Sequence, residues 1–461
     1  MNKAIASAST PPRQIEEELA GPALSPVERR SRVTTLDVLR GFALLGILAV
    51  NIETFSGPES IHDIPVGMAL PAFVGWHAHL DLVILIIKWA FVEGKMRAMF
   101  GMLFGAGVVL LTNRIERRAG AGNAADIYVR RNMWLGLFGL IHGMIIWEGD
   151  ILLQYALCAL LFLYPFRRLP GRTLIGLGML IWIVGGTFGI LNFFDAPHVI
   201  AQGDILVSAR AAERAGSDLT DEQQTSLTNA LEQDRARPAS IASAVSAGRA
   251  GFWDGLPARA NADIDFVYHV FRDGWIAEVV GCMLVGMGLY HIGFLSGTFT
   301  ERTYFLTAVI GYLITWPIVL VGIWKTKEAG FSDAAALRWM YSPYDVEQAA
   351  GMLANAAAVI LIVKAGALRW LTNCLAAAGR MAFSNYVATS LICQSLFSWG
   401  PYKMFGSLQY YQELFVVLAI WVFNLLISPL WLRWFAFGPL EWLWRSLTYW
   451  ERQPFRIGAR R

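Results

Sequence analysis

Apolar runs approaching twenty residues, interrupted by short polar stretches, follow one another along most of the chain. An α-helix needs about 20 apolar residues to cross a bilayer, whereas a membrane β-barrel would show shorter segments of alternating polarity, which this sequence lacks. The pattern predicts an all-α polytopic membrane protein with about nine to eleven transmembrane helices. The runs expected to cross are 34–55, 96–111, 133–147, 151–166, 173–194, 275–290, 304–324, 346–363, 381–399 and 414–432.

The direction of the first crossing follows from the charges beside it. Arg29, Arg30 and Arg32 precede the first apolar run, and basic residues accumulate on the cytoplasmic side of membrane proteins. The N-terminus is therefore expected in the cytoplasm. The run at 79–93 is short and charged, so we interpret it as a half-helix or an interfacial helix on the outer side. The basic loop expected between the runs at 96–111 and 133–147 then also faces the cytoplasm, although a full crossing at 79–93 stays open.

These boundaries divide the chain into five predicted segments. The first is a disordered cytoplasmic tail, and the second is a transmembrane bundle that holds the candidate active site. A helical, hydrophilic insert follows as a periplasmic cap. A second transmembrane bundle and a Trp-rich, amphipathic tail at the cytoplasmic interface complete the chain. In the order just given, the segments are 1–32, 33–194, 195–271, 272–437 and 438–461.

Composition agrees with a membrane protein. Hydrophobic residues make up 56% of the 461 positions and charged residues 16%, which is below the roughly 25% of a soluble domain. The four cysteines lie inside apolar runs without metal-ligand or disulfide spacing, so no metal is expected. We expect the lipid bilayer and no nucleic acid as a partner, and we leave a homodimer open.

A polar stripe crosses the first predicted helix. Asp37 and Arg40 are three positions apart, so they share a helix face and are expected to pair. Asn51 returns to nearly the same face three turns later. Because lipid cannot solvate such groups, the stripe must face protein or a water-filled cavity.

His142 is the strongest candidate for a catalytic base. It lies inside an apolar run between two glycines, and its ordinary pKa allows both charge states near neutrality. A histidine that ties two helices together is an equally weighted interpretation. Asp150 is placed to orient this base, or to cap the helix that follows it, or to do both.

Other polar residues carry weaker signals. For His62, His77 and His79 we favour solvated positions in loops. Basic residues after the run at 96–111 satisfy the positive-inside rule without any ligand, and they also suit an anionic cofactor such as a phosphorylated carrier. From this group we take Arg114, Arg130 and Arg131, together with Arg40 and Asp37, as candidate cofactor-binding residues.

Three motifs give the chain a family resemblance. They are LDVLRG at 36–41 with Asn51-Ile52, FGLIHG at 138–143 continuing through DILLQYA at 150–156, and GRMAFSNY at 379–386 with GPLEWLWR at 438–445. In these motifs the chain resembles the YeiB-like bacterial inner-membrane proteins of the DUF418 type. One departure is Phe383-Ser384, where Leu-Thr is usual. The resemblance implies a multi-pass protein of the bacterial inner membrane.

The opening motif is also similar to that of the transmembrane acyltransferases, which include heparan-α-glucosaminide N-acetyltransferase. This resemblance implies transfer of an acyl group from cytoplasmic acyl-CoA to an acceptor on the far side. The heparan enzyme has an asparagine where Asn51 stands, and its catalytic histidine falls at the position of His62. Bacterial O-acyltransferases have a histidine in place of Asn51. Under their mechanism Asn51 is not the base, and His142 is the alternative.

We therefore expect a membrane-embedded acyltransferase that uses acetyl-CoA or another acyl-CoA. Its acceptor is expected to be a hydroxyl or amine of a periplasmic glycan or lipid. The candidate catalytic residues are His142, Asn51, His62 and Asp150. A transporter or channel for a small anionic or zwitterionic solute is the alternative, and a non-catalytic assembly protein is a third interpretation.

Overall fold

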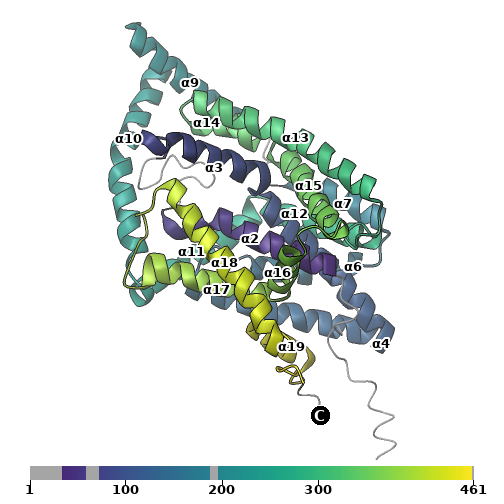
Figure 1. The fold of residues 1–461 in the computed structure, drawn as a ribbon. Coiled ribbons are helices and arrows are strands. Elements are labelled where there is room, and N and C mark those ends of the chain that lie inside the picture. The colour runs from purple at the N-terminus through teal and green to yellow at the C-terminus, as the bar shows by residue number, and fades with distance from the viewer. Residues whose placement is uncertain (1–33, 59–71, 187–195, 459–461) are drawn as a thin grey trace, which may run out of the picture.

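A computed structural model describes residues 34–58, 72–186 and 196–458, and within these ranges the chain is helical (Figure 1). The isolated bridge between Phe435 and Arg456 is the one β-type pairing that the described residues contain. His62 lies outside the described residues, so its predicted role is not addressed by the structure. The all-α prediction is confirmed for the described part.

The helices before the insert are α2 (Thr34–Ser56), α3 (Ala78–Phe91), α4 (Lys95–Ile141), α5 (Leu152–Cys158), α6 (Tyr164–Phe166) and α7 (Gly171–Gly185). A 3₁₀ turn, η2 (Gly75–His77), precedes α3, and π-helical turns η3 (His142–Ile146) and η4 (Ala159–Leu163) follow α4 and α5. The insert forms α9 (Ala196–Ala215), α10 (Asp221–Gly248) and α11 (Phe252–Arg272).

The C-terminal helices are α12 (Trp275–His291), α13 (Glu301–Glu328), α14 (Asp333–Ala336), α15 (Tyr344–Lys364), α16 (Arg369–Arg380), α17 (Ala382–Gln394), α18 (Tyr410–Trp434) and α19 (Pro439–Tyr449). Two more π-helical turns, η5 (Leu337–Tyr341) and η6 (Ser395–Trp399), follow α14 and α17.

Five helical stretches are long and apolar enough to cross a membrane: Thr35–Ser56, Gly75–Arg118, Glu301–Glu328, Tyr344–Lys364 and Tyr410–Trp434. Shorter apolar stretches are Leu152–Phe166, Gly171–Gly185 and Trp275–His291. These helices support a membrane protein, whereas the count of nine to eleven crossings stays a prediction.

Helix α4 corrects one expectation about the basic segment. The sequence suggested a cytoplasmic loop between runs at 96–111 and 133–147, but the backbone stays helical through this segment and is broken only at Gly120 (φ 84°, ψ 170°). Arginine, alanine and glutamate favour helix, and the positive φ of the break suits glycine. The arginines of this segment are therefore held on helix faces.

Close backbone contacts join the two ends of the chain. A Cβ added at Gly41 of α2 would lie 2.0 Å from the Leu375 carbonyl oxygen of α16, and one added at Gly379 would lie 1.9 Å from that of Asp37. Small residues allow two helices to approach this closely. The contact brings the opening motif of the sequence against the motif that begins at Gly379.

The insert is helical, as predicted. Helices α9 and α10 form the upper left edge of the view in Figure 1, and α11 returns to pack on η3. Two side-chain contacts attach the insert elsewhere: Arg338 pairs with Asp204 of α9 at 2.8 Å, and Arg249 donates to the Phe405 carbonyl oxygen at 2.7 Å. The insert therefore reaches the segment that carries His142.

Candidate functional site

His142 is buried at the point where α4 passes into the π-helical turn η3. Its Nδ1 lies 3.0 Å from Asp150 Oδ1, and both side chains are almost fully inaccessible. Neither of these two atoms makes a hydrogen bond in the structure. A base and the carboxylate that orients it are often poorly aligned before a substrate binds. The pair is therefore close enough for the carboxylate to orient the imidazole.

Asp150 makes a contact that corresponds to each of the two roles that the sequence suggested. While Oδ1 faces the histidine, Oδ2 accepts a hydrogen bond of 2.8 Å from the Leu153 backbone N–H at the start of α5. An aspartate at a helix start satisfies backbone N–H groups that have no partner within the helix. The cap thus fixes the carboxylate that faces His142.

A serine completes the contacts of the imidazole. Ser390 Oγ of α17 lies 3.0 Å from His142 Nε2, although the two residues are 248 positions apart. One turn earlier on α17, the ring of Tyr386 packs against the imidazole with 4.9 Å between centroids. His142 is therefore held between α5 and α17.

The insert contributes an acidic neighbour. A Cβ added at Gly143 would lie 2.2 Å from Asp263 Oδ1 of α11, so the glycine leaves room for this carboxyl group. Burial, followed by the nearby Asp150 and Glu148 carboxylates, raises the pKa of Asp263 to about 7. Asp263 is therefore poised to gain or lose a proton beside the His142–Asp150 pair near neutral pH.

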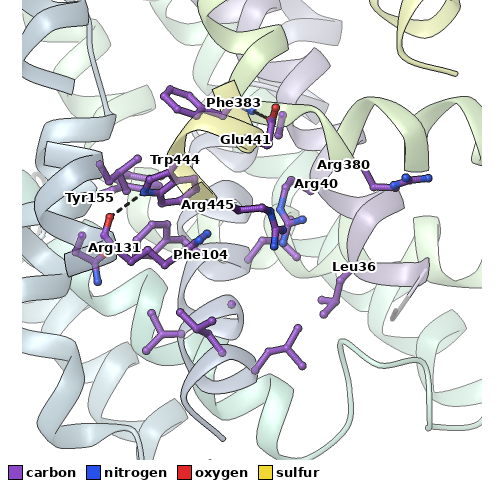
Figure 2. A pocket seen from close by; sticks show the side chains of 18 of the residues that line it. Leu36, Arg40, Phe104, Arg131, Tyr155, Arg380, Phe383, Glu441, Trp444 and Arg445 are labelled. Carbon is purple, nitrogen blue, oxygen red and sulfur yellow. Dashed lines mark hydrogen bonds between the residues drawn. The ribbon is translucent and has the colours of Figure 1, made fainter. Parts of the chain in front are cut away.

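An arginine-rich pocket of about 270 Å³ adjoins these residues, because Tyr386, whose ring packs against His142, also lines the pocket. Its apolar lining includes Phe100, Phe104 and Leu135. Figure 2 shows charged side chains entering it from several helices. Its six arginines are Arg40, Arg114, Arg118, Arg131, Arg380 and Arg445.

The acidic side chains that line this pocket are fewer. Among the lining residues, all of them described, they are Asp37 and Glu441. Asp37 pairs with Arg40 at 3.2 Å, as predicted. Glu441 Oε1 accepts hydrogen bonds from the Phe383 and Ser384 backbone N–H groups at 2.7 and 3.1 Å, which caps α17. Six guanidinium groups against two carboxylates give the pocket a positive charge that suits a polyanion.

Aromatic rings flank the cations. The Arg131 guanidinium lies 3.6 Å from the centroid of the Trp444 ring, and Trp444 Nε1 donates to the Arg131 carbonyl oxygen at 2.9 Å (Figure 2). An arginine stacked on an indole keeps its edge available for bidentate contacts with phosphate.

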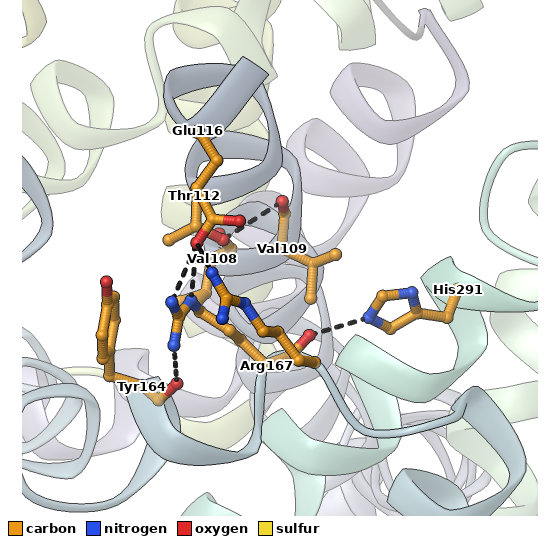
Figure 3. A network of polar contacts seen from close by, with 8 residues as sticks. Val108, Val109, Thr112, Glu116, Tyr164, Arg167 and His291 are labelled. Atoms are coloured by element: carbon orange, nitrogen blue, oxygen red, sulfur yellow. Dashed lines mark hydrogen bonds and ion pairs between the residues drawn. The ribbon is translucent and has the colours of Figure 1, made fainter. Parts of the chain in front are cut away.

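A second group of arginines, outside the pocket, shares one carboxylate. Arg167 donates to Glu116 Oε1 at 2.8 Å and its carbonyl oxygen contacts His291 Nε2 at 3.0 Å (Figure 3). Arg168 contacts the same Glu116 oxygen at 3.1 Å. These contacts tie α4, α6 and α12 together, which is a structural role.

The structure gathers four of the five predicted cofactor-binding residues into the pocket: Asp37, Arg40, Arg114 and Arg131. Arg130 is not among the lining residues. It pairs with Asp126 and donates to the Thr448 carbonyl oxygen at 3.1 Å. Successive side chains of an α-helix point about 100° apart, so Arg130 and Arg131 leave α4 in different directions.

No contact in the described part of the structure joins the Asn51 side chain to His142 or Asp150. Its carbonyl oxygen accepts from Thr54 Oγ1 at 2.9 Å, and its neighbours Leu48 and Ile52 pack with Trp147 and Phe397. His77, expected in a solvated loop, is instead buried and lies 2.7 Å from Asp81, so that expectation was wrong.

Several site residues were missed by sequence reasoning. Ser390, Arg380 and Arg445 lie in or near the motifs of the C-terminal half, but the sequence gives no sign that they approach His142 or the first helix. Arg118 was visible only as one more charge of the basic segment. These four residues are identified because they lie close to a residue that the sequence had already suggested, and only the tertiary structure shows that they do.

Comparisons with known proteins place the chain among related sequences. A family model described as "Protein of unknown function (DUF418)" matches residues 289–451. YeiB of Escherichia coli strain K12 is 30% identical over 428 residues, covering 90% of this chain and 96% of YeiB. YxaH of Bacillus subtilis strain 168 is 27% identical, covering 94% and 98% of the two chains.

A 39.9 kDa protein of the amylase 3′ region of Bacillus acidopullulyticus is 26% identical, covering 94% of this chain and 99% of the relative. No solved structure matches the chain. The match to YeiB extends over nearly the full length of both proteins, and the DUF418 match covers the segment that supplies Arg380, Ser390 and Arg445. The chain therefore belongs to the YeiB-like DUF418 family.

Proposed function

We propose that this protein is a membrane-embedded acyltransferase, which moves an acyl group, most simply acetyl, from cytoplasmic acyl-CoA to an acceptor on the periplasmic side. The observation that carries the proposal is the buried His142–Asp150 pair, separated by one aromatic residue from an arginine-rich pocket. A polyanion site beside an oriented base is what transfer from acyl-CoA requires.

The pocket has the chemistry to hold the donor. Coenzyme A carries a diphosphate and a 3′-phosphate, and clustered guanidinium groups bind phosphates through paired hydrogen bonds. Trp444 and Phe104 supply aromatic surface for an adenine ring, and the apolar lining near Leu135 and Leu152 suits the carrier arm and the acyl chain. On this assignment the thioester points towards Tyr386.

His142 supplies the base. The Asp150 carboxylate can only accept a hydrogen bond, so it favours the tautomer with the proton on Nδ1. Nε2 is then free to take a proton from the attacking hydroxyl or amine. Asn51 keeps its proposed role in holding the acceptor or the developing oxyanion.

The finer topology is part of the same proposal. The protein crosses the bacterial inner membrane about nine to eleven times, with its N-terminus in the cytoplasm and its insert in the periplasm. The acceptor is a periplasmic glycan or lipid. The five long apolar helices and the basic residues of α4 support this arrangement.

Binding of coenzyme A to the detergent-purified protein tests the donor site. We expect coenzyme A to bind more tightly than dephospho-CoA, and dephospho-CoA more tightly than pantetheine, in calorimetric titrations. Arg445→Gln should weaken coenzyme A binding about 10- to 150-fold, since a charged hydrogen bond contributes about 1.5–3 kcal/mol. Arg172→Gln, the same change at an exposed arginine outside the pocket, is the control. If the protein does not bind coenzyme A at millimolar concentrations of the ligand, the proposed function is overturned.

A transporter is the second candidate, because a separate network of charges is buried near α3. Lys88 Nζ lies 2.7 Å from Glu53 Oε1 and 3.7 Å from Glu93 Oε2. Lys95, which is fully buried, pairs with Glu347. Buried ionisable groups in membrane helices often mark solute or proton pathways. Uptake of radiolabelled acetate or glycine by proteoliposomes, abolished by Glu347→Gln, would favour transport.

A further inference from the structure

We propose that Ser390 is a catalytic nucleophile, which carries the acyl group as a covalent ester between donor and acceptor. This inference rests on the proposed acyl transfer. Ser390 Oγ lies 3.0 Å from His142 Nε2, and His142 Nδ1 lies 3.0 Å from Asp150 Oδ1. A nucleophile, a base and a carboxylate in this order form the arrangement that activates serine in unrelated hydrolases.

One tautomer of His142 favours attack by serine. When the neutral ring carries its proton on Nδ1, beside the Asp150 carboxylate, Nε2 is an acceptor and the Ser390 hydroxyl donates to it. The competing partner is the Tyr386 carbonyl oxygen, 3.2 Å from Ser390 Oγ. One hydroxyl hydrogen serves one of these acceptors at a time. Rotation towards Nε2 is the step that prepares the nucleophile.

Rigid elements hold the three residues. Glu441 caps the start of α17 through the Phe383 and Ser384 N–H groups, and Asn385 Nδ2 donates to Ser428 Oγ at 2.9 Å. At the other side, Asp150 is fixed by the start of α5. A nucleophile supported by packed helices keeps its distance to the base, which a loop would not ensure.

Tyr386 connects this arrangement with the donor pocket. Its ring both lines the pocket and packs against the imidazole, and Ser390 follows one turn later on the same helix. Ser390, His142 and Asp150 are each about 2% exposed. The thioester reaches Ser390 by displacing the Tyr386 ring, and the same burial keeps water away from the ester that forms.

The first half-reaction balances without a further reactant. Ser390 Oγ attacks the thioester carbonyl, the Oγ–H proton passes to His142 Nε2, and the carbon–sulfur bond breaks. The proton then passes from Nε2 to the sulfur, so that free coenzyme A leaves and Ser390 carries the acyl ester.

The second half-reaction restores the enzyme. The acceptor hydroxyl or amine gives its proton to Nε2 while its oxygen or nitrogen attacks the ester carbonyl. The bond between Ser390 Oγ and the acyl carbon breaks, and Oγ recovers the proton. Donor and acceptor therefore need not occupy the site together, which suits substrates that arrive from opposite sides of a membrane.

The test uses the full chain in detergent with radiolabelled acetyl-CoA and no acceptor. We expect acid-stable label on one peptide, the mass of one acetyl group on Ser390, and release of the label by hydroxylamine. A covalent intermediate also exchanges labelled coenzyme A into acetyl-CoA without an acceptor, so this exchange is the second readout.

Substitutions distinguish a nucleophilic Ser390 from a Ser390 that only supports the fold. Ser390→Ala should lose both label and exchange while it still binds coenzyme A, and Ser390→Cys should regain label as a thioester. Ser398→Ala, at another buried serine after α17, should keep both readouts. Coenzyme A binding by the wild type without label or exchange would overturn the covalent step and leave the donor site standing. Label or exchange that survives Ser390→Ala would also overturn the covalent step. If the wild type does not bind coenzyme A, both proposals are overturned.

Discussion

At the scale of single residues, the site depends on which polar partners each side chain meets. His142 faces the Asp150 carboxylate, from the turn before α5, on one nitrogen and the Ser390 hydroxyl of α17 on the other. Arg167 and Arg168, just after α6, share Glu116, whereas six arginines and two carboxylates line the pocket. The balance of lining charges thus distinguishes the pocket from the cluster around Glu116.

Asp150→Asn tests the orientation of the base. The amide oxygen of asparagine still caps α5, so we expect little change in thermal stability. Loss of the carboxylate should lower the rate of coenzyme A exchange about 10²- to 10⁴-fold, because the imidazole loses its preferred tautomer. Asp150→Ala should add a stability loss of about 1 kcal/mol from the missing cap. A wild-type rate in Asp150→Asn would show that His142 does not depend on this carboxylate.

Asp263 predicts a pH dependence of stability. Burial, reinforced by Asp150 and Glu148, raises its pKa from 3.8 to about 7 in the folded state. A raised pKa means that the folded state holds the proton more tightly. The protonated Asp263 carboxyl group therefore contributes its full stabilisation of the folded state below pH 3.8, and this stabilisation is lost as pH rises through about 7. Melting temperatures measured across this range should fall less in Asp263→Asn than in the wild type. Asp254→Asn, at an exposed carboxylate of the same helix, should follow the wild type, and parallel curves for all three proteins would contradict the prediction.

At the scale of elements, the site is built by two unusual features. The π-helical turn η3 presents His142 at the end of α4, and the glycine contact between α2 and α16 brings Arg40 near Arg380. Helix α17 then extends from the pocket, at Phe383, to the His142–Asp150 pair, at Ser390. One helix therefore connects the arginine-rich pocket with the candidate nucleophile.

Gly41→Ala tests the contact between α2 and α16. The added methyl group meets backbone atoms that cannot rotate away, so we expect a loss of about 1–3 kcal/mol in the free energy of unfolding and weaker coenzyme A binding. Gly176→Ala in α7, where an added Cβ meets nothing within 4 Å, should be neutral or slightly stabilising. Equal melting temperatures for the two variants would show that α2 and α16 separate easily.

At the scale of the whole molecule, both halves of the chain share one core. Buried residues of α2, α4, α12 and α15 belong to the same hydrophobic cluster. The pocket likewise takes arginines from α2, α4, α16 and α19. The division into an N-terminal and a C-terminal bundle stays a prediction from the sequence, and the candidate site draws on both segments.

Cysteine accessibility tests the proposed topology. In a Cys374→Ala background, Ser217→Cys in the insert should react with a membrane-impermeant maleimide in intact spheroplasts. Glu451→Cys, just after α19, should react only after permeabilisation. Both introduced positions are exposed, so a difference in labelling reports their side of the membrane. The reverse pattern would invert the proposed orientation.

The sequence by itself was sufficient for the helical membrane class, the Asp37–Arg40 pair and the placement of Asp150 at the start of a helix. Each depends on local spacing: an apolar run, a separation of three positions, or a capping residue before a helix. The same local reasoning failed for the basic segment after Leu111, because charge suggested a loop while the helix-forming residues there continue α4 as far as Gly120.

Only the tertiary structure decided which polar groups meet. Ser390 and His142 are 248 positions apart, and the pocket arginines come from both ends of the chain. No periodicity within one helix encodes such distances, since they follow from how glycine-lined helices pack against each other. The sequence determined which residues are expensive to bury in a membrane, and the packing determined which of them are buried together.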